Sequence, residues 1–178
     1  MLRKLLIGLL VLLAVAAVVG LTMPTTWRVE RTAVIAAPAA VVFPLIDDLE
    51  RWPEWTSWNT SADPSMTRTF KGGKTAGAGA EMAWVGDEVG EGNLTIAESV
   101  PGRRVRYDLE LEQDGFVSHG QIALEPARDG VIVTWSTEGE LGLNPLVRLM
   151  GPWIERAVGT DFEVGLTGLK RAAEGKRI

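Results

Sequence analysis

The chain has 178 residues, no cysteine, one histidine and a formal net charge of −5 at pH 7. The lack of cysteine excludes disulfides, thiolate metal sites and thiol nucleophiles, and a single histidine excludes a multi-histidine metal centre, so we predict no metal and no cofactor. The apolar residues concentrate in the first 23 positions and acidic residues outnumber basic ones in the rest, which argues against nucleic acid as a partner, because that binding needs clustered lysine and arginine.

The N-terminal segment from Leu5 to Leu21 contains no charged residue. Extended to Met23 it has about 19 residues, which as a helix rise roughly 25–28 Å and just cross the hydrocarbon core of a bilayer. We therefore divide the chain into a transmembrane anchor at residues 1–23 and one domain at residues 24–178, a length that suits a single hydrophobic core.

Basic residues indicate how this anchor is oriented. Arg3 and Lys4 precede the apolar run, and the next basic residue is Arg28. The positive-inside rule then places the N-terminus in the cytoplasm and the domain on the extracytoplasmic side of a cell membrane that the chain crosses once. A cleaved signal peptide is the alternative, because Ala14-Val15-Ala16 has the small-x-small pattern of a cleavage site. The apolar run continues to Leu21, which favours a retained anchor.

The domain is predicted to begin with a strand and two helices. Apolar and polar residues alternate from Trp27 to Ile35, which is typical of a half-buried strand. Between Pro38 and Leu49 the apolar residues recur at helical spacing, and Pro38 suits a first turn. A second, short helix is expected to hold three tryptophans spaced three residues apart, namely Trp52, Trp55 and Trp58.

A series of strands follows. One is predicted near residues 66–70, and five more are separated by glycine-containing turns. The five segments are Ala80–Val85, Asn93–Val100, Arg103–Glu112, Phe116–Glu125 and Val131–Thr137. Together with the first strand they form an antiparallel meander of about seven strands.

A long amphipathic helix is predicted after the last strand. Asn144 and Pro145 suit an N-cap and a first turn, and apolar residues then recur at intervals of three and four up to Ala172. The helix should break near Gly151-Pro152. The result is an α+β domain in which a curved sheet buries one face against the C-terminal helix and leaves an apolar cavity between them.

Six sequence stretches stand out along the domain: WPEWTSW (52–58), DPSM (63–66), GAGAEMAWVGDEVGEGNLTI (77–96), ESVPGRRVRY (98–107), VTWSTEG (133–139) and GTDFEVGLTGLK (159–170). Together with the order of the elements, they resemble the polyketide cyclase/dehydrase-like branch of the START/Bet v 1-like superfamily, also called SRPBCC. The resemblance implies a helix-grip fold and a domain that binds a hydrophobic ligand, and relatives include lipid carriers and polyketide aromatase/cyclases. The superfamily has no universal catalytic residues, so none is transferred to this chain.

Two glycine-rich motifs fail as phosphate-binding loops. Gly73-Lys74-Thr75 would need another glycine where Arg68 stands to form a P-loop. Gly77-Ala78-Gly79 would need a glycine in place of Met82 to form a dinucleotide-binding fingerprint, and a predicted strand follows it where that motif needs a helix. Both segments are therefore predicted to be loops or turns.

The alternation of side chains along each strand predicts which of them reach the cavity. Tyr107 is placed inward as the best polar candidate, and Trp84 and Trp135 are placed there as rings that either stack on a ligand or belong to the core. Glu98 has the same parity as Ile96, so we expect its carboxylate on the apolar side, with a pKa that burial raises into a useful acid/base range. Alternatively, Glu98 lies near a strand end and reaches water or an arginine.

The single histidine is predicted to take no part in a catalytic triad. Ser118 and His119 are consecutive strand residues and point to opposite faces, so a Ser118–His119–Asp114 triad cannot form. His119 is expected on the convex, solvent-exposed face of the sheet.

The three spaced tryptophans would form an aromatic ridge on a helix. The ridge is interpreted as a cap that seals one end of the sheet, or as a lid over the cavity or a membrane-facing patch. Trp55 is accordingly included among the candidate ligand contacts.

Three functions are compatible with these patterns. The leading hypothesis is a membrane-tethered domain that binds a lipid or other hydrophobic small molecule without turnover, because tethering concentrates the domain where such ligands are. The alternative is a polyketide cyclase/dehydratase-like enzyme in which Tyr107 polarises a carbonyl and Glu98 moves a proton. The third is an interaction module with a filled pocket and a partner on the convex face.

Overall fold

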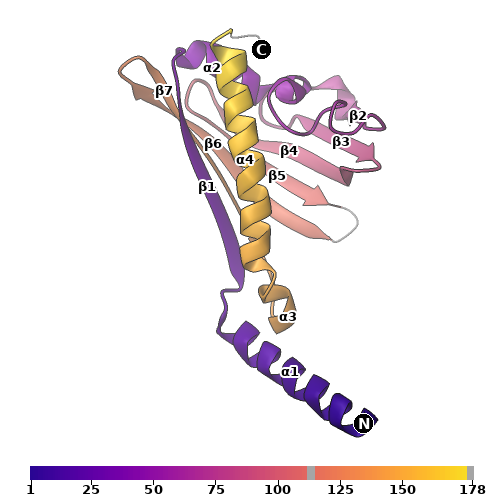
Figure 1. Cartoon of the computed structure of the whole chain (residues 1–178). Coiled ribbons are helices and arrows are strands. Elements are labelled where there is room, and N and C mark those ends of the chain that lie inside the picture. The colour runs from indigo at the N-terminus through magenta and orange to yellow at the C-terminus, as the bar shows by residue number, and fades with distance from the viewer. Residues whose placement is uncertain (112–114, 176–178) are drawn as a thin grey trace.

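A computed structural model describes residues 1–111 and 115–175 of the chain (Figure 1). Its helices and strands agree with the predicted order. They are α1 (Leu2–Thr22), β1 (Thr26–Ile35), α2 (Ala39–Asp47), the 3-10 helix η1 (Leu49–Glu54), β2 (Thr67–Phe70), the 3-10 helix η2 (Lys71–Gly73), β3 (Glu81–Gly86), β4 (Gly90–Val100), β5 (Arg104–Leu111), β6 (Phe116–Ala127), β7 (Gly130–Glu140), α3 (Pro145–Arg148) and α4 (Gly151–Ala173).

The strands form one antiparallel sheet of seven strands in the order β1-β7-β6-β5-β4-β3-β2. This arrangement confirms the predicted meander, with β1 added beside the last strand. The predicted end of β5 at Glu112 and the turn residue Asp114 lie outside the described residues.

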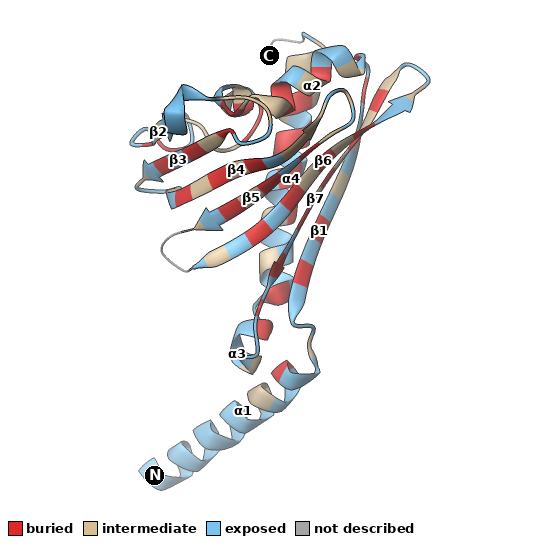
Figure 2. Cartoon of the chain, turned by 180° about the vertical axis from the view of Figure 1, so that it is seen from behind, coloured by how far each residue is buried: buried red, intermediate tan, exposed pale blue. Residues whose placement is uncertain are grey.

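Helix α4 crosses the concave face of the sheet. In Figure 1 the helix lies in front of the strands, and in Figure 2 the strands lie in front of the helix. Its buried residues recur at helical spacing and face the sheet: Gly151, Gly159, Phe162, Gly165, Leu166 and Leu169. The break predicted at Gly151-Pro152 is confirmed, because α3 ends at Arg148 and α4 begins at Gly151. A single hydrophobic core therefore lies between sheet and helix, and α2 and η1 close one end of it.

Glycines opposite aromatic residues shape the concave face. A Cβ atom at Gly120, for example, would overlap the ring of Tyr107, which is its partner in the antiparallel register. Because a glycine has no side chain, the aromatic ring paired with it can pack directly over the backbone of the neighbouring strand. The same relation holds in three registered pairs: Trp84 with Gly92, Tyr107 with Gly120, and Trp27 with Gly139.

Helix α1 extends away from the domain and exposes its apolar side chains along almost its whole length (Figures 1 and 2). It is long and apolar enough to cross a membrane, a property that signal sequences share. Only its C-terminal end contacts the domain, where Gly20 is buried against Pro145 of α3. A Cβ atom at Gly20 would overlap the Pro145 carbonyl, so glycine permits this close approach.

Candidate functional site

A cavity of about 220 Å³ lies between the concave face of the sheet and α4. Its wall is mainly aromatic and aliphatic, with a few hydroxyl groups and one carboxylate. The lining residues are Trp27, Thr56, Ser57, Trp58, Trp84, Val89, Tyr107, Leu109, Leu111, Phe116, Ser118, Trp135, Thr137, Val158, Asp161 and Phe162. An apolar wall with a small number of polar groups is the usual composition of a small-molecule site.

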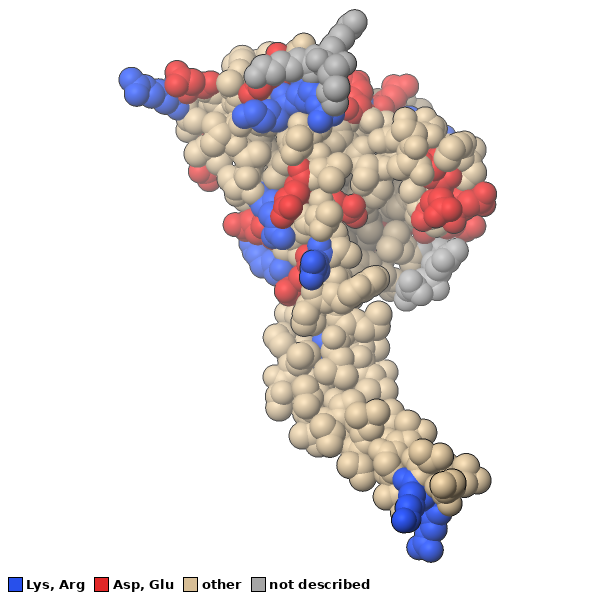
Figure 3. All heavy atoms as spheres, in the orientation of Figure 1, with Lys and Arg blue, Asp and Glu red and all other residues tan. Residues whose placement is uncertain are grey.

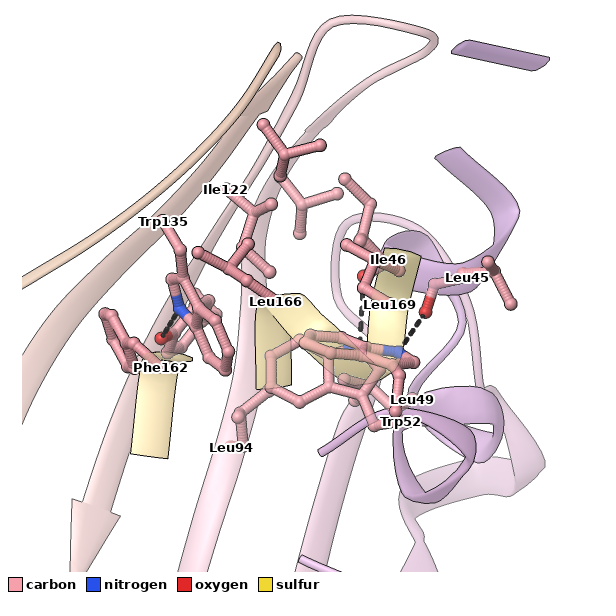
Figure 4. Close-up of a cluster of buried hydrophobic side chains, with 14 of the residues drawn as sticks. Leu45, Ile46, Leu49, Trp52, Leu94, Ile122, Trp135, Phe162, Leu166 and Leu169 are labelled. Atoms are coloured by element: carbon pink, nitrogen blue, oxygen red, sulfur yellow. Dashed lines mark hydrogen bonds between the residues drawn. The ribbon is translucent and has the colours of Figure 1, made fainter. Parts of the chain in front are cut away.

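Stacked rings hold this wall in place. The rings of Trp135 and Phe162 stack with centroids 3.9 Å apart, as Figure 4 shows, and Gly165 on α4 gives the Trp135 ring its space. Trp58 stacks on Trp84 with centroids 5.8 Å apart. Aromatic contacts of this kind add about 0.5–1.5 kcal/mol each beyond the area that they bury, so these stacked pairs stabilise the wall.

Tyr107 provides the most defined polar group in the cavity. Its hydroxyl oxygen accepts a hydrogen bond of 2.7 Å from the Trp135 indole Nε1–H, and its side chain is buried. Burial raises the pKa of Tyr107 well above its ordinary value, which keeps the hydroxyl neutral. The hydroxyl therefore retains a proton that it can donate to a ligand oxygen, while Trp135 fixes its position.

Sequence reasoning missed Thr137 and Asp161 as polar groups of the wall, whereas the alternation along β6 had placed Ser118 on this face without naming it as a candidate. Ser118 and Thr137 lie on neighbouring strands and are buried, and both face the cavity. Asp161 lies at the rim on α4, and partial burial raises the pKa of its carboxyl. The helical spacing of apolar residues predicted that Phe162 faces the sheet, but no pattern indicated that Asp161 beside it borders a cavity.

The prediction for Glu98 was wrong. The ladder between β4 and β5 shifts by one residue between Ile96 and Glu98, so Glu98 pairs with Arg106 on the outer face and Ser99 takes the inward position. Such a β-bulge reverses the alternation of every residue that follows it on the strand. At this inward position the Ser99 hydroxyl donates a hydrogen bond of 2.5 Å to the Asp47 carboxylate.

The predicted rise in the pKa of Glu98 was also wrong, because the side chain is not buried on the apolar face. Arg104 Nη2 lies 2.8 Å from one carboxylate oxygen, and Arg106 Nε lies 3.5 Å from the other. The pKa of Glu98 is lowered, chiefly because Arg104 donates hydrogen bonds to the ionised form. The alternative, in which Glu98 reaches an arginine, is the arrangement observed, and Glu98 is not part of the cavity.

The alternation predicted for β6 is confirmed. Ser118 is buried on the cavity side, whereas His119 is exposed on the outer face, where its Nδ1 lies 2.6 Å from the Asp108 carboxylate. Asp114 lies outside the described residues. No group of three or more histidine, aspartate or glutamate side chains arranged to hold a metal ion occurs among residues 1–111 and 115–175.

The three spaced tryptophans differ in what they contact. Trp52 and Trp55 are buried, and their indole N–H groups donate to the carbonyl oxygens of Ile46 and Leu45 (Figure 4). The prediction that one short helix holds all three tryptophans was wrong, because η1 ends before Trp55 and only Trp52 lies on it. Trp52 and Trp55 hold η1 and the residue that follows it against α2, and both belong to the core. Trp58, at the end of the row, is the one of the three that lines the cavity.

A second, wider groove of about 990 Å³ lies outside the cavity, between the ends of β1, β6 and β7 and the α3–α4 corner. Trp27 and Phe116 border both the groove and the cavity. Their rings stack with centroids 5.5 Å apart. This stacked pair therefore separates the two spaces.

Comparison with known proteins gives a family match over the whole domain. Residues 26–174 match the family described as Polyketide cyclase / dehydrase and lipid transport. The matched range runs from the start of β1 to the end of α4. No curated protein shows significant sequence similarity to the chain.

Solved structures share the fold. Protein CV1439 from Chromobacterium violaceum is 21% identical with a TM-score of 0.56, and the match covers 85% of this chain and 99% of that one. The di-domain ARO/CYC StfQ from the steffimycin biosynthetic pathway is 13% identical with a TM-score of 0.66, covering 85% of this chain and 52% of that one. SA2116 from Staphylococcus aureus is 9% identical with a TM-score of 0.65, covering 84% and 94%. These similarities confirm the helix-grip fold.

Proposed function

Because this chain belongs to the polyketide cyclase/dehydrase and lipid transport family, we propose that it is a membrane-tethered domain that binds a hydrophobic small molecule or lipid in the cavity beneath α4. The observation that carries the proposal is the cavity itself, which has aromatic walls and one positioned hydroxyl donor at Tyr107. The hypothesis of an interaction module predicts a filled pocket, so the cavity argues against it.

The volume of the cavity limits the ligand. An apolar cavity of about 150 Å³ holds a benzene molecule, so about 220 Å³ suits one or two small rings or a short stretch of acyl chain. Because Trp27 and Phe116 border both spaces, we propose that a longer ligand continues past this pair into the groove of about 990 Å³. A lipid would thus place one end beside Tyr107 and the rest in the groove.

Membrane tethering is proposed from α1. Its apolar length, the basic residues Arg3 and Lys4 at its start, and the close packing of Gly20 against Pro145 all support a retained anchor with a cytoplasmic N-terminus. Figure 3 shows these two basic residues at the far tip of an otherwise uncharged helix. Cleavage after Ala16 would leave the apolar end of α1 attached to the domain.

The ligand can be identified from the full-length chain in its native membrane. The chain is extracted in polymer-bounded lipid discs, and the molecules bound to it are released with organic solvent and analysed by mass spectrometry. Ser118→Leu, which places a larger side chain in the cavity, is the test variant, and Ser136→Leu on the opposite face of the sheet is the matched control. We expect one class of molecule to be lost only from Ser118→Leu.

The same variants provide a binding test with defined probes. A fluorescent fatty acid and a naphthalene probe should bind the unaltered chain and Ser136→Leu, but bind Ser118→Leu weakly. The proposed function is wrong if two results are found together: the unaltered chain and Ser118→Leu carry the same molecules, and the unaltered chain binds neither probe.

A cyclase or dehydratase activity is the second candidate, and one observation favours it. Tyr107, which can polarise a carbonyl, lines the same cavity as the carboxyl of Asp161, and partial burial raises the pKa of that carboxyl. Glu98, the carboxylate first considered for this role, lies on the outer face. Asp161→Asn should abolish turnover of a polyketide substrate and leave its binding intact if this candidate is correct, whereas an unchanged rate excludes the role of Asp161.

A further inference from the structure

One apolar surface of the domain stays exposed within the described residues 1–111 and 115–175. Six of the seven tryptophans are buried or partly buried, but Trp153 at the start of α4 is 68% exposed. Leu143, just before α3, is 84% exposed. We call the exposed side chains of this corner the α3 face; they are Leu143, Leu146, Val147, Met150 and Trp153. Contiguous exposed apolar side chains of this kind mark an interaction surface.

The α3 face exposes almost no charge. Between Glu140 and Glu155 the only charged residue is Arg148. Its side chain is buried, and its Nε donates to the Gly142 carbonyl at 3.0 Å. Figure 3 shows an uncharged surface that continues from the anchor onto this corner of the domain. A protein partner is usually recognised with a charged or polar rim, whereas this surface matches the apolar interior of a bilayer.

The α3 face also lies beside the end of the anchor. Helix α1 ends at Thr22 and β1 begins at Thr26, so three residues connect them. Three extended residues reach at most about 11 Å. The spacer is also tied to the α3 side of the domain, because Leu141 N donates to the Thr25 carbonyl at 2.7 Å, and Gly20 packs on Pro145 of α3. The α3 face therefore cannot move far from the membrane surface if α1 spans the bilayer.

We propose that the α3 face inserts into the surface of the same bilayer that holds α1, as a second membrane contact that fixes the orientation of the domain. This inference rests on the proposed tether. The occupant is the lipid surface, with Trp153 at the headgroup level, where indole rings are favoured. Because Val147 and Met150 border the groove of about 990 Å³, this orientation holds the groove against the lipid.

The lack of cysteine allows a direct test on the full-length chain in vesicles of phosphatidylethanolamine and phosphatidylglycerol. Single cysteines are introduced by Leu146→Cys and Met150→Cys and labelled with a nitroxide. Val164→Cys, an equally exposed apolar position farther along α4, is the matched control, and Leu12→Cys reports the anchor. The accessibility of each nitroxide to a water-soluble nickel complex and to oxygen is measured by electron paramagnetic resonance.

We expect the probes at Leu146 and Met150 to lose nickel accessibility and gain oxygen accessibility, as the Leu12 probe does, while the Val164 probe stays exposed to water. Adding Trp153→Glu to Leu146→Cys should restore nickel accessibility, whereas Val164→Glu should not. If the Leu12 probe is in lipid and the Leu146 and Met150 probes are as water-exposed as Val164, the docking face is overturned and the tether stands. A water-exposed Leu12 probe overturns the tether and the docking face with it.

Discussion

Tyr107 and Trp135 form a buried hydrogen-bonded pair in the wall of the cavity, in which the Trp135 indole fixes the position of the Tyr107 hydroxyl. The distance of 2.7 Å between the indole nitrogen and the hydroxyl oxygen makes each side chain dependent on the other. A buried donor that loses its acceptor costs about 1–3 kcal/mol, which is more than the net gain of about 0.5–1.5 kcal/mol from the bond itself. Changes at Tyr107 therefore alter stability as well as binding.

Tyr107→Phe should lower the free energy of unfolding by about 1–3 kcal/mol, because the Trp135 N–H is left buried without an acceptor. It should also weaken binding of an aromatic ketone by roughly two- to tenfold relative to the matching hydrocarbon, because the donor is lost. Urea denaturation and fluorescence titration measure the two effects. Equal losses of affinity for ketone and hydrocarbon would show that Tyr107 does not contact the ligand oxygen.

Gly120→Ala should destabilise the domain by about 1–3 kcal/mol, because its Cβ overlaps the Tyr107 ring. In a strand without such a clash the same change would stabilise by about 0.5–1 kcal/mol, so the sign of the effect is diagnostic. The measurement is urea denaturation of Gly120→Ala, Tyr107→Ala and the double variant. The double variant should lose less than the sum of the two single variants, and simple additivity would contradict the proposed overlap.

The hairpin of β3 and β4 is held by a carboxylate from outside the sheet. Asp63 is 1% exposed, and its Oδ2 accepts from the backbone N–H groups of Glu88 and Val89 at 2.8 and 3.1 Å, while its Oδ1 accepts from Ser65. The hydroxyl of Ser65 and these backbone groups lower the pKa of Asp63 from 3.8 to about 2. Protonation therefore loosens the hairpin next to Trp84, whose indole N–H donates to Val89.

This pKa shift predicts a pH dependence of stability. A carboxyl whose pKa is lower in the folded state stabilises fully above the unfolded pKa of about 3.8 and loses that stabilisation as the pH falls through about 2. Asp63→Asn should lower the melting temperature by several degrees at pH 7 and remove part of the loss between pH 4 and pH 2. Thermal unfolding followed across that range tests this, with Asp87→Asn in the same hairpin as the control.

The molecule combines a helix that is apolar enough to cross a membrane with an acidic, folded domain. The proposed orientation, with a cytoplasmic N-terminus, rests on the two basic residues near Met1. Asp129→Cys in the exposed turn between β6 and β7 should react with a membrane-impermeant maleimide in intact cells if the domain is extracytoplasmic, as we propose. Leu2→Cys, at the opposite end, keeps both basic residues and should react only after lysis. The reverse pattern would place the domain in the cytoplasm, and loss of the Leu2→Cys label site from the mature protein would show cleavage.

Local patterns were sufficient to predict most of the architecture. Period two and glycine-containing turns predicted the seven strands, and spacing by three and four predicted α4 with its break at Gly151-Pro152, because each element leaves one apolar face in its own sequence. Alternation also placed Tyr107 and Trp135 inward and His119 outward correctly.

The site itself depended on contacts between residues far apart in the chain. The bulge after Ile96 turned Glu98 outward, and parity along one strand cannot reveal a shift that arises only when β4 is paired with β5. Asp161 became a rim residue only where α4 crosses the sheet. The position of the α3 face likewise depends on contacts between distant parts of the chain, because packing of Gly20 on Pro145 brings this apolar corner of the domain to the C-terminal end of α1. Periodicity records the environment of one element, whereas a cavity or a docking face exists only where several elements meet.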